Sequence, residues 1–166
     1  MPTQVGISAA RRRILRPYAL RKPKDYVPTA PGDPAQVDTL YLRPLPGVVL
    51  KQFTARDVVS RWNVIEVRTR ATAATAAEFL TSLKFRLPFP LRAVQVDGGS
   101  EFMAEFEAAC QRAGIRLFML PPRSPKLNGL LERAHRSHIE EFWECYDGHL
   151  DLPSLCLAPL GLGADP

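Results

Sequence analysis

The sequence predicts an α/β fold in which a five-stranded mixed sheet is flanked by helices. Two observations indicate this class: three strand-like segments come first, and helical and strand-like segments then alternate. This order is typical of a mixed sheet covered by helices. The chain has 166 residues, of which 46% are hydrophobic, so it fits one domain of ordinary size with a substantial core.

The first three strands are predicted at 35–42, 48–55 and 62–68. Side chains alternate between the two faces of a strand, so Gln36, Asp38, Leu40 and Leu42 are expected to share one face. Pro44-Leu45-Pro46-Gly47 forms a turn after the first strand, and residues 57–61 form a hairpin loop after the second. Asp57 is therefore predicted to be a turn residue, with a role near a functional site as the less favoured alternative.

A helix is predicted at 72–87, because Ala and Leu recur there at helical spacing. Thr72 can cap its first turn, and Pro88 stops it. The fourth strand follows at 91–97. It is apolar on both faces apart from two polar residues, which favours a central position in the sheet.

The remaining elements alternate in the same way. Ser100 is expected to cap a helix at 101–113 that ends at Gly114. The fifth strand is predicted at 115–120. After the proline-rich basic loop 121–128, Asn128 caps a last helix that continues to about residue 146.

The net charge of +5 is concentrated in the first part of the chain. Residues 1–26 carry seven Lys and Arg and one Asp, whereas 27–166 carry 15 basic and 16 acidic residues. We predict a basic, proline-rich arm or linker at 1–34, because its prolines exclude a sustained helix or central strand. A concentrated basic arm fits phosphate binding, and a solubilising linker is the alternative.

Cysteine content and hydropathy favour a protein that acts in the cytoplasm. The three cysteines, Cys110, Cys145 and Cys156, lack close metal-binding spacing and are interpreted as reduced thiols. No run of 18 apolar residues is present, so no transmembrane helix and no membrane partner are expected. Residues 1–10 lack the apolar block of a signal peptide.

Three carboxylates occur on regular elements. Asp38 lies within the first strand, Asp97 ends the fourth, and Glu132 lies in the first turn of the last helix. Acids in apolar runs are costly to bury unless they are paired or bind a metal, and a few of them suffice for Mg²⁺, which keeps several waters. Taken singly, each has a simpler explanation as a polar strand residue, a turn residue or an acid favoured by the helix dipole.

The motifs around these acids resemble the catalytic core of DDE transposases and retroviral-type integrases, specifically the bacterial insertion-sequence transposases. They are Gln-Val-Asp-Thr at 36–39, Val-Asp-Gly-Gly-Ser-Glu-Phe at 96–102 and Ser-Pro-Lys-Leu-Asn-Gly-Leu-Leu-Glu-Arg at 124–133. Asp97 and Glu132 are separated by 34 residues. The resemblance covers roughly residues 11–155, and 35–155 would form the integrase catalytic core.

The resemblance implies a ribonuclease H-like fold, two Mg²⁺ or Mn²⁺ ions and DNA strand transfer. Asp38, Asp97 and Glu132 would be the catalytic residues and metal ligands. Two ions about 3.5–4 Å apart activate a water or a DNA 3′-hydroxyl and stabilise the leaving oxygen. The partners would be transposon ends and target DNA, together with a further copy of the chain or a full-length transposase, in the cytoplasm and nucleoid of a bacterium.

Several residues around the motifs are expected to contact the DNA backbone. They are Arg11, Arg12, Arg13, Arg123, Lys126, Asn128, Arg133 and Arg136. A solvated loop is the alternative for the loop residues, and Arg133 could instead pair with an acid of the core.

The end of the chain departs from the family pattern. Residues 156–166 contain two Gly and two Pro and cannot form the family's terminal helix, so they are treated as a tail outside the core. A core truncated at both ends, marginally stable and catalytically silent, is therefore expected. Two alternatives stay open: an inactive remnant that binds only DNA or a full-length transposase, and a ribonuclease H-like nuclease.

Overall fold

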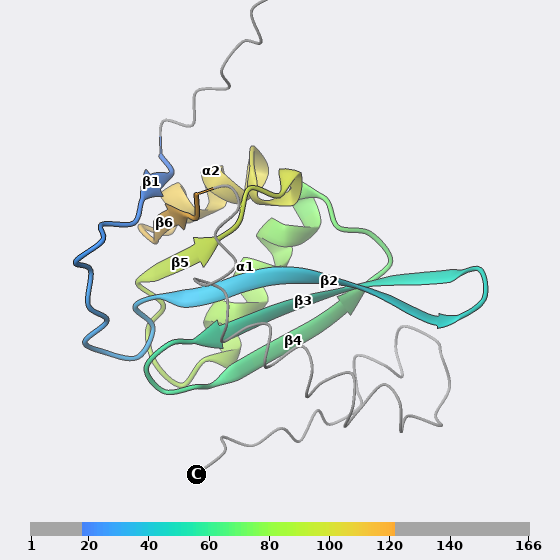
Figure 1. Ribbon diagram of the computed structural model, residues 1–166, viewed down its shortest axis with the longest axis horizontal. Helices are drawn as coiled ribbons and strands as arrows, with labels where there is room; N and C mark the ends of the chain where they lie inside the picture. Colours follow the sequence, from blue (N-terminus) through green and yellow to red (C-terminus); the bar gives the residue numbers. More distant parts are fainter. Residues whose placement is uncertain (1–17, 122–166) are drawn as a thin grey trace, which may run out of the picture.

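The computed structural model describes residues 18–121, which form a mixed sheet with helices on one side (Figure 1). The elements in chain order are β1 (Leu20–Arg21), β2 (Ala35–Leu45), β3 (Val48–Asp57), β4 (Asn63–Arg68), α1 (Ala73–Arg86), β5 (Ala93–Val96), the 3₁₀ helix η1 (Ser100–Phe102), α2 (Glu105–Arg112) and β6 (Arg116–Met119). The predicted α/β class is confirmed, and the five predicted strands correspond to β2 through β6.

The sheet order in this part of the chain is β1-β6-β5-β2-β3-β4. The β2, β3 and β4 strands pair antiparallel, as expected for strands joined by hairpins. The β5 strand pairs parallel to both β2 and β6, so it is central, as its apolar sequence predicted. The parallel strands β1, β6, β5 and β2 therefore run towards the same end of the sheet.

The segment that was expected to be an extended arm adds a sixth strand. Leu20 and Arg21 form the short strand β1, which pairs parallel to β6. Tyr18 donates its hydroxyl proton to the carbonyl of Ile115 at 2.7 Å, and its backbone N–H donates to Glu107 Oε1 at 3.0 Å. Prolines exclude central strands but are tolerated beside a short edge strand, and the sequence analysis did not consider that case.

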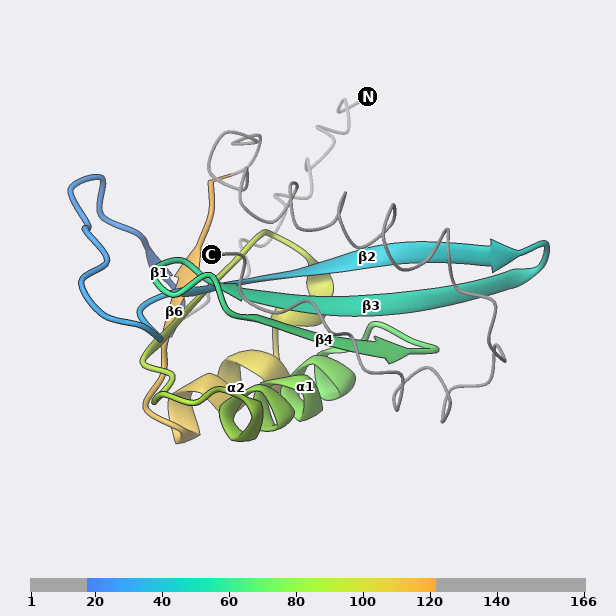
Figure 2. The ribbon, with the colours of Figure 1, turned by 90° about the horizontal axis from the view of Figure 1, so that it is seen from below.

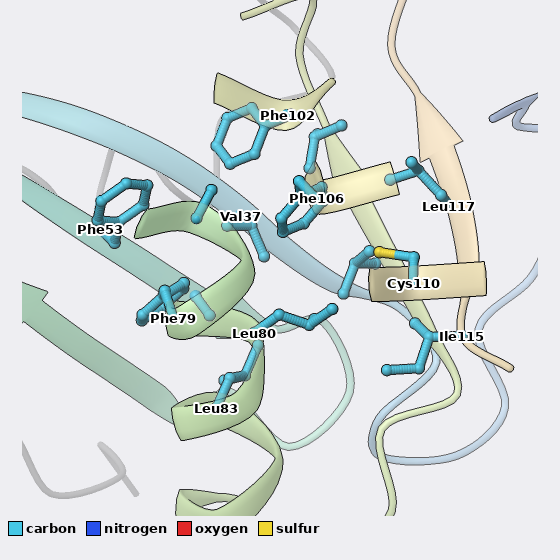
Figure 3. Close-up of a cluster of buried hydrophobic side chains, with 14 of the residues drawn as sticks. Val37, Phe53, Phe79, Leu80, Leu83, Phe102, Phe106, Cys110, Ile115 and Leu117 are labelled. Atoms are coloured by element: carbon cyan, nitrogen blue, oxygen red, sulfur yellow. The ribbon is translucent and has the colours of Figure 1, made fainter. Parts of the chain in front are cut away.

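Both α-helices cover the same face of the sheet (Figure 2). Between them and the sheet lies a core in which Phe53 stacks on Phe79, with ring centroids 5.4 Å apart, and Phe102 meets Phe106 edge to face (Figure 3). All four rings are fully buried. Burying each such ring contributes about 1.5–3 kcal/mol, so this face supplies most of the hydrophobic stabilisation that the described residues show.

The helix predicted at 72–87 is confirmed by α1. Thr72 and Thr75 cap its start reciprocally, because the N–H of Thr75 donates to Thr72 Oγ1 at 3.2 Å and the N–H of Thr72 donates to Thr75 Oγ1 at 2.8 Å.

The single helix predicted at 101–113 is wrong. The 3₁₀ helix η1 ends at Phe102, and α2 begins only at Glu105, after Ala104 adopts a positive φ of 44°. The break lets Phe102 enter the core while Glu101 stays beside the end of β5. Ser100 does not cap a helix, but Gly114 ends α2 with a φ of 66°, as predicted.

Candidate active site

Asp38 lies in β2, and Asp97 directly follows the last residue of the neighbouring parallel strand β5. The β2–β5 register pairs Ala35 with Val94 and Gln36 with Gln95. When this register is continued by two residues, Asp38 comes opposite Asp97. Neighbouring strands are about 4.8 Å apart, so this continued register places the backbone of Asp38 beside that of Asp97 at the carboxyl end of β5.

Both acids belong to the face of the sheet that α1 and α2 do not cover. Val37 and Val96 pack in the core under the helices, and side chains alternate along a strand. Asp38 and Asp97 therefore share the opposite face, to which Gln36 also belongs, as the sequence analysis predicted for Gln36 and Asp38.

The end of β5 shapes the surroundings of Asp97. Its Oδ1 accepts a hydrogen bond from the N–H of Gly99 at 2.9 Å, which is the local turn that Asp residues commonly form. A Cβ at position 99 would lie 2.7 Å from Glu101 Oε2 and 3.0 Å from Asp97 Oδ1. Only glycine leaves both carboxylates where they are, so Glu101 borders the same space as Asp97.

A backbone hydrogen bond and the neighbouring strand β3 position Asp38. Its Oδ1 accepts a hydrogen bond from the N–H of Thr39 at 2.8 Å, and its partner across the β2–β3 ladder is Thr54, which is fully buried. Gln52 Nε2 donates to Thr54 Oγ1 at 3.0 Å. A buried polar group is costly unless it is hydrogen-bonded, so this contact offsets the cost of burying Thr54 and Gln52 on β3 next to Asp38.

The chemistry of the donor set fits a hard divalent cation. Asp38 lies within β2 and Asp97 directly follows β5, so two carboxylates are available there, and oxygen is the ligand that Mg²⁺ and Mn²⁺ prefer. Within residues 18–121 no group of three metal-ligating side chains is assembled, and Glu132 lies outside the described range.

The other predicted site residues also lie outside the described part of the chain and stay predictions. They are Arg11, Arg12, Arg13, Arg123, Lys126, Asn128, Arg133 and Arg136.

Two residues of this region received no site role from the sequence analysis. Glu101 belongs to the Asp-Gly-Gly-Ser-Glu motif, and its fixed distance from Asp97 was the available signal. Lys22 lies on the same edge and donates to Gln95 Oε1 at 2.9 Å. Nothing local in the sequence connects Lys22 with Gln95, because 73 residues separate them.

The integrase core domain family matches residues 28–125, which is more than half of the chain and includes both aspartates. The chain belongs to this family. The matched range ends before Glu132, so the third predicted catalytic residue is not part of the match.

Solved integrase structures share the fold of this integrase core. A chain of the simian T-cell lymphotropic virus intasome in complex with PP2A regulatory subunit B56 gamma superposes with a TM-score of 0.59 at 21% identity, covering 66% of this chain and 40% of that one. The catalytic core domain of BIV integrase superposes with a TM-score of 0.54 at 24% identity, covering 64% of this chain and 66% of that one. These likenesses confirm the ribonuclease H-like fold.

Two further comparisons complete the description. No curated protein matches the chain. None of the helices between residues 18 and 121 is long and apolar enough to cross a membrane.

Proposed function

We propose that the chain is the catalytic core of a DDE-type transposase or integrase that cuts DNA phosphodiester bonds and joins DNA strands with Mg²⁺ or Mn²⁺. The observation that carries the proposal is the level placement of Asp38 and Asp97 on adjacent strands, within the range that the integrase core family matches. Paired carboxylates at the carboxyl edge of a sheet suit phosphoryl transfer, which needs charge and positioning rather than a protein nucleophile.

The described residues have distinct roles in this proposal. Asp38 and Asp97 hold the metal ions, with Glu132 as the third ligand. When bound, two such ions activate the attacking water or 3′-hydroxyl and stabilise the leaving oxygen. The N–H groups of Thr39 and Gly99 each bind one Oδ1 and so orient the two carboxylates. Glu101 adds negative charge beside Asp97, which raises the attraction for a divalent cation.

The narrower assignment follows from the motifs. We propose that the protein is of the bacterial insertion-sequence type, acts on transposon ends and target DNA in the cytoplasm and nucleoid, and works with further copies of itself or with a full-length transposase.

The test measures metal-dependent DNA cleavage and metal-dependent stability on the full chain. The proposal departs from the catalytically silent core expected from the end of the sequence. With Mn²⁺, the wild type should nick plasmid DNA, and Asp38→Asn, Asp97→Asn and Glu132→Gln should each lose at least about 100-fold in rate, because each removes a ligand charge. Glu78→Gln is the matched control, since Glu78 is exposed on α1, which covers the face of the sheet opposite to the two aspartates. Mn²⁺ at about 100 times its Kd should add about 2.7 kcal/mol to the free energy of unfolding, and Asp97→Asn should abolish that gain.

The alternatives predict different outcomes. Mn²⁺ stabilisation without cleavage would favour an inactive remnant. Faster cleavage of RNA in an RNA–DNA hybrid than of plasmid DNA would favour the ribonuclease H-like nuclease. A wild type that neither cleaves nor gains stability with Mn²⁺ would refute the proposed function.

A further inference from the structure

A pocket of about 420 Å³ opens at the edge of the sheet beyond the two aspartates. Three basic residues line it: Arg21, Lys22 and Lys24. Its apolar walls are Pro23, Leu120 and Pro121. Its lining includes no acidic side chain, so its electrostatic potential is positive.

The strand register shows that the pocket and the two aspartates lie at the same level along the strands. Arg21 and Val96 are both paired with Met119, from the two sides of β6. One residue further along each strand, Lys22, Leu120 and Asp97 stand level. Lys22 and Asp97 are thus two strand spacings apart, about 10 Å. The basic pocket and the two aspartates therefore lie side by side at the same end of the sheet.

Lys22 is held over the same face of the sheet as the acids. Its Nζ donates to Gln95 Oε1 at 2.9 Å and lies 5.5 Å from the centre of the Tyr26 ring. Gln95 is two residues before Asp97 and almost fully buried. Burial lowers the pKa of Lys22, and the nearby Asp33 opposes that shift.

Asp33, the acid that acts on Lys22, already forms an ion pair with Arg116. Arg116 Nη2 donates to Asp33 Oδ2 at 2.7 Å, and Tyr26 donates its hydroxyl proton to Asp33 Oδ1. Asp33 is therefore shared between Arg116 and Tyr26, of which Tyr26 lines the pocket. Lys24 and Arg21 are exposed, so their charges are available to a ligand that enters.

We propose that this pocket binds one nucleotide of the DNA strand on which the acid pair acts. Lys22 and Lys24 contact its phosphate, and the apolar wall contacts its sugar or base. The volume lies within the range of small-ligand pockets, about 300–1,000 Å³. The separation of about 10 Å corresponds to about three nucleotides at a rise of 3.4 Å each, and to fewer if the strand is extended. The proposal rests on the proposed function, because the acids define which strand is meant.

The experiment measures binding of a fluorescent single-stranded oligonucleotide to the full chain in EDTA, where the metal site plays no part. The test variant is the double Lys22→Ala, Lys24→Ala. The control is the double Lys84→Ala, Arg112→Ala, which removes the same charge from exposed positions on α1 and α2, on the opposite side of the sheet. Lys24→Ala alone guards against misfolding, since Lys24 is exposed.

We expect the test variant to raise Kd about tenfold and to flatten the slope of log K against log salt by about 1.4, at 0.7 per lost phosphate contact. Lys24→Ala alone should flatten it by about 0.7, with an unchanged melting temperature. The control should change Kd by less than about twofold.

Equal Kd values and slopes for the test and control variants would refute nucleotide binding in the pocket while leaving the proposed function intact. If the test variant loses binding but the wild type does not cleave DNA, the results would support nucleotide binding in the pocket and count against the proposed chemistry.

Discussion

Asp57 ties the hairpin loop after β3 to the segment that leads into β2, and its removal should be strongly destabilising. The side chain is 1% exposed. Its Oδ1 accepts a hydrogen bond from the N–H of Gly32 at 2.7 Å, and its Oδ2 accepts from the N–H and Oγ of Ser60 at 2.6 and 2.7 Å. Asp57 is thus the last residue of β3 rather than a residue of the predicted turn, but its side chain holds the turn that follows and the segment that leads into β2.

The magnitude follows from these three contacts. A hydrogen bond to a charged group contributes about 1.5–3 kcal/mol, and a buried donor left without a partner costs about 1–3 kcal/mol. Water can replace Asp57 at the partly buried Ser60 contacts, whereas the contact to Gly32 is buried. Asp57→Ala should therefore lower the free energy of unfolding by about 3–5 kcal/mol. Asp57→Asn keeps one acceptor oxygen and should lose about half as much.

Urea unfolding followed by the fluorescence of Trp62, which lies in the same loop, measures these losses. Asp25→Ala is the control, because an exposed substitution changes stability by less than about 0.5 kcal/mol. A loss of about 3–5 kcal/mol is a large fraction of the 5–15 kcal/mol of a typical domain, so it is readily resolved. An Asp57→Ala variant as stable as Asp25→Ala would refute this account of the turn.

Two further predictions concern the alkaline pH range and the basic arm. Burial, with a smaller contribution from Glu107, raises the pKa of the Cys110 thiol from its ordinary value of 9.0 to about 12. The unfolded thiol ionises first, so the stabilisation is complete below pH 9 and is lost as the pH rises towards 12. The melting temperature of the wild type should therefore fall more steeply than that of Cys110→Ala above about pH 9, and parallel profiles would contradict the assignment. Deleting residues 1–17 removes four arginines but keeps β1, so the salt slope of duplex DNA binding should flatten by up to about 3.6, whereas an unchanged slope would make the arm a linker.

The sequence by itself predicted the strands β2 to β6 and the helix α1. It also predicted that Asp38 lies within a strand and that Asp97 lies at the end of one. These signals are local, since hydrophobic periodicity, the Thr72 cap and the turn glycines act within a few residues of the element that they define. The motifs around Asp38 and Asp97 identified the integrase core before any strand order was known, and the family match includes both.

Only the tertiary structure decided which distant residues stand together. The register between β2 and β5 makes Asp38 level with Asp97, and β1 brings Lys22 into the same row. The break at Ala104, which separates Glu101 from α2, also depends on packing rather than on helix propensity. Hydrogen-bonded register and core packing join segments far apart in the chain, so no local pattern carries that information.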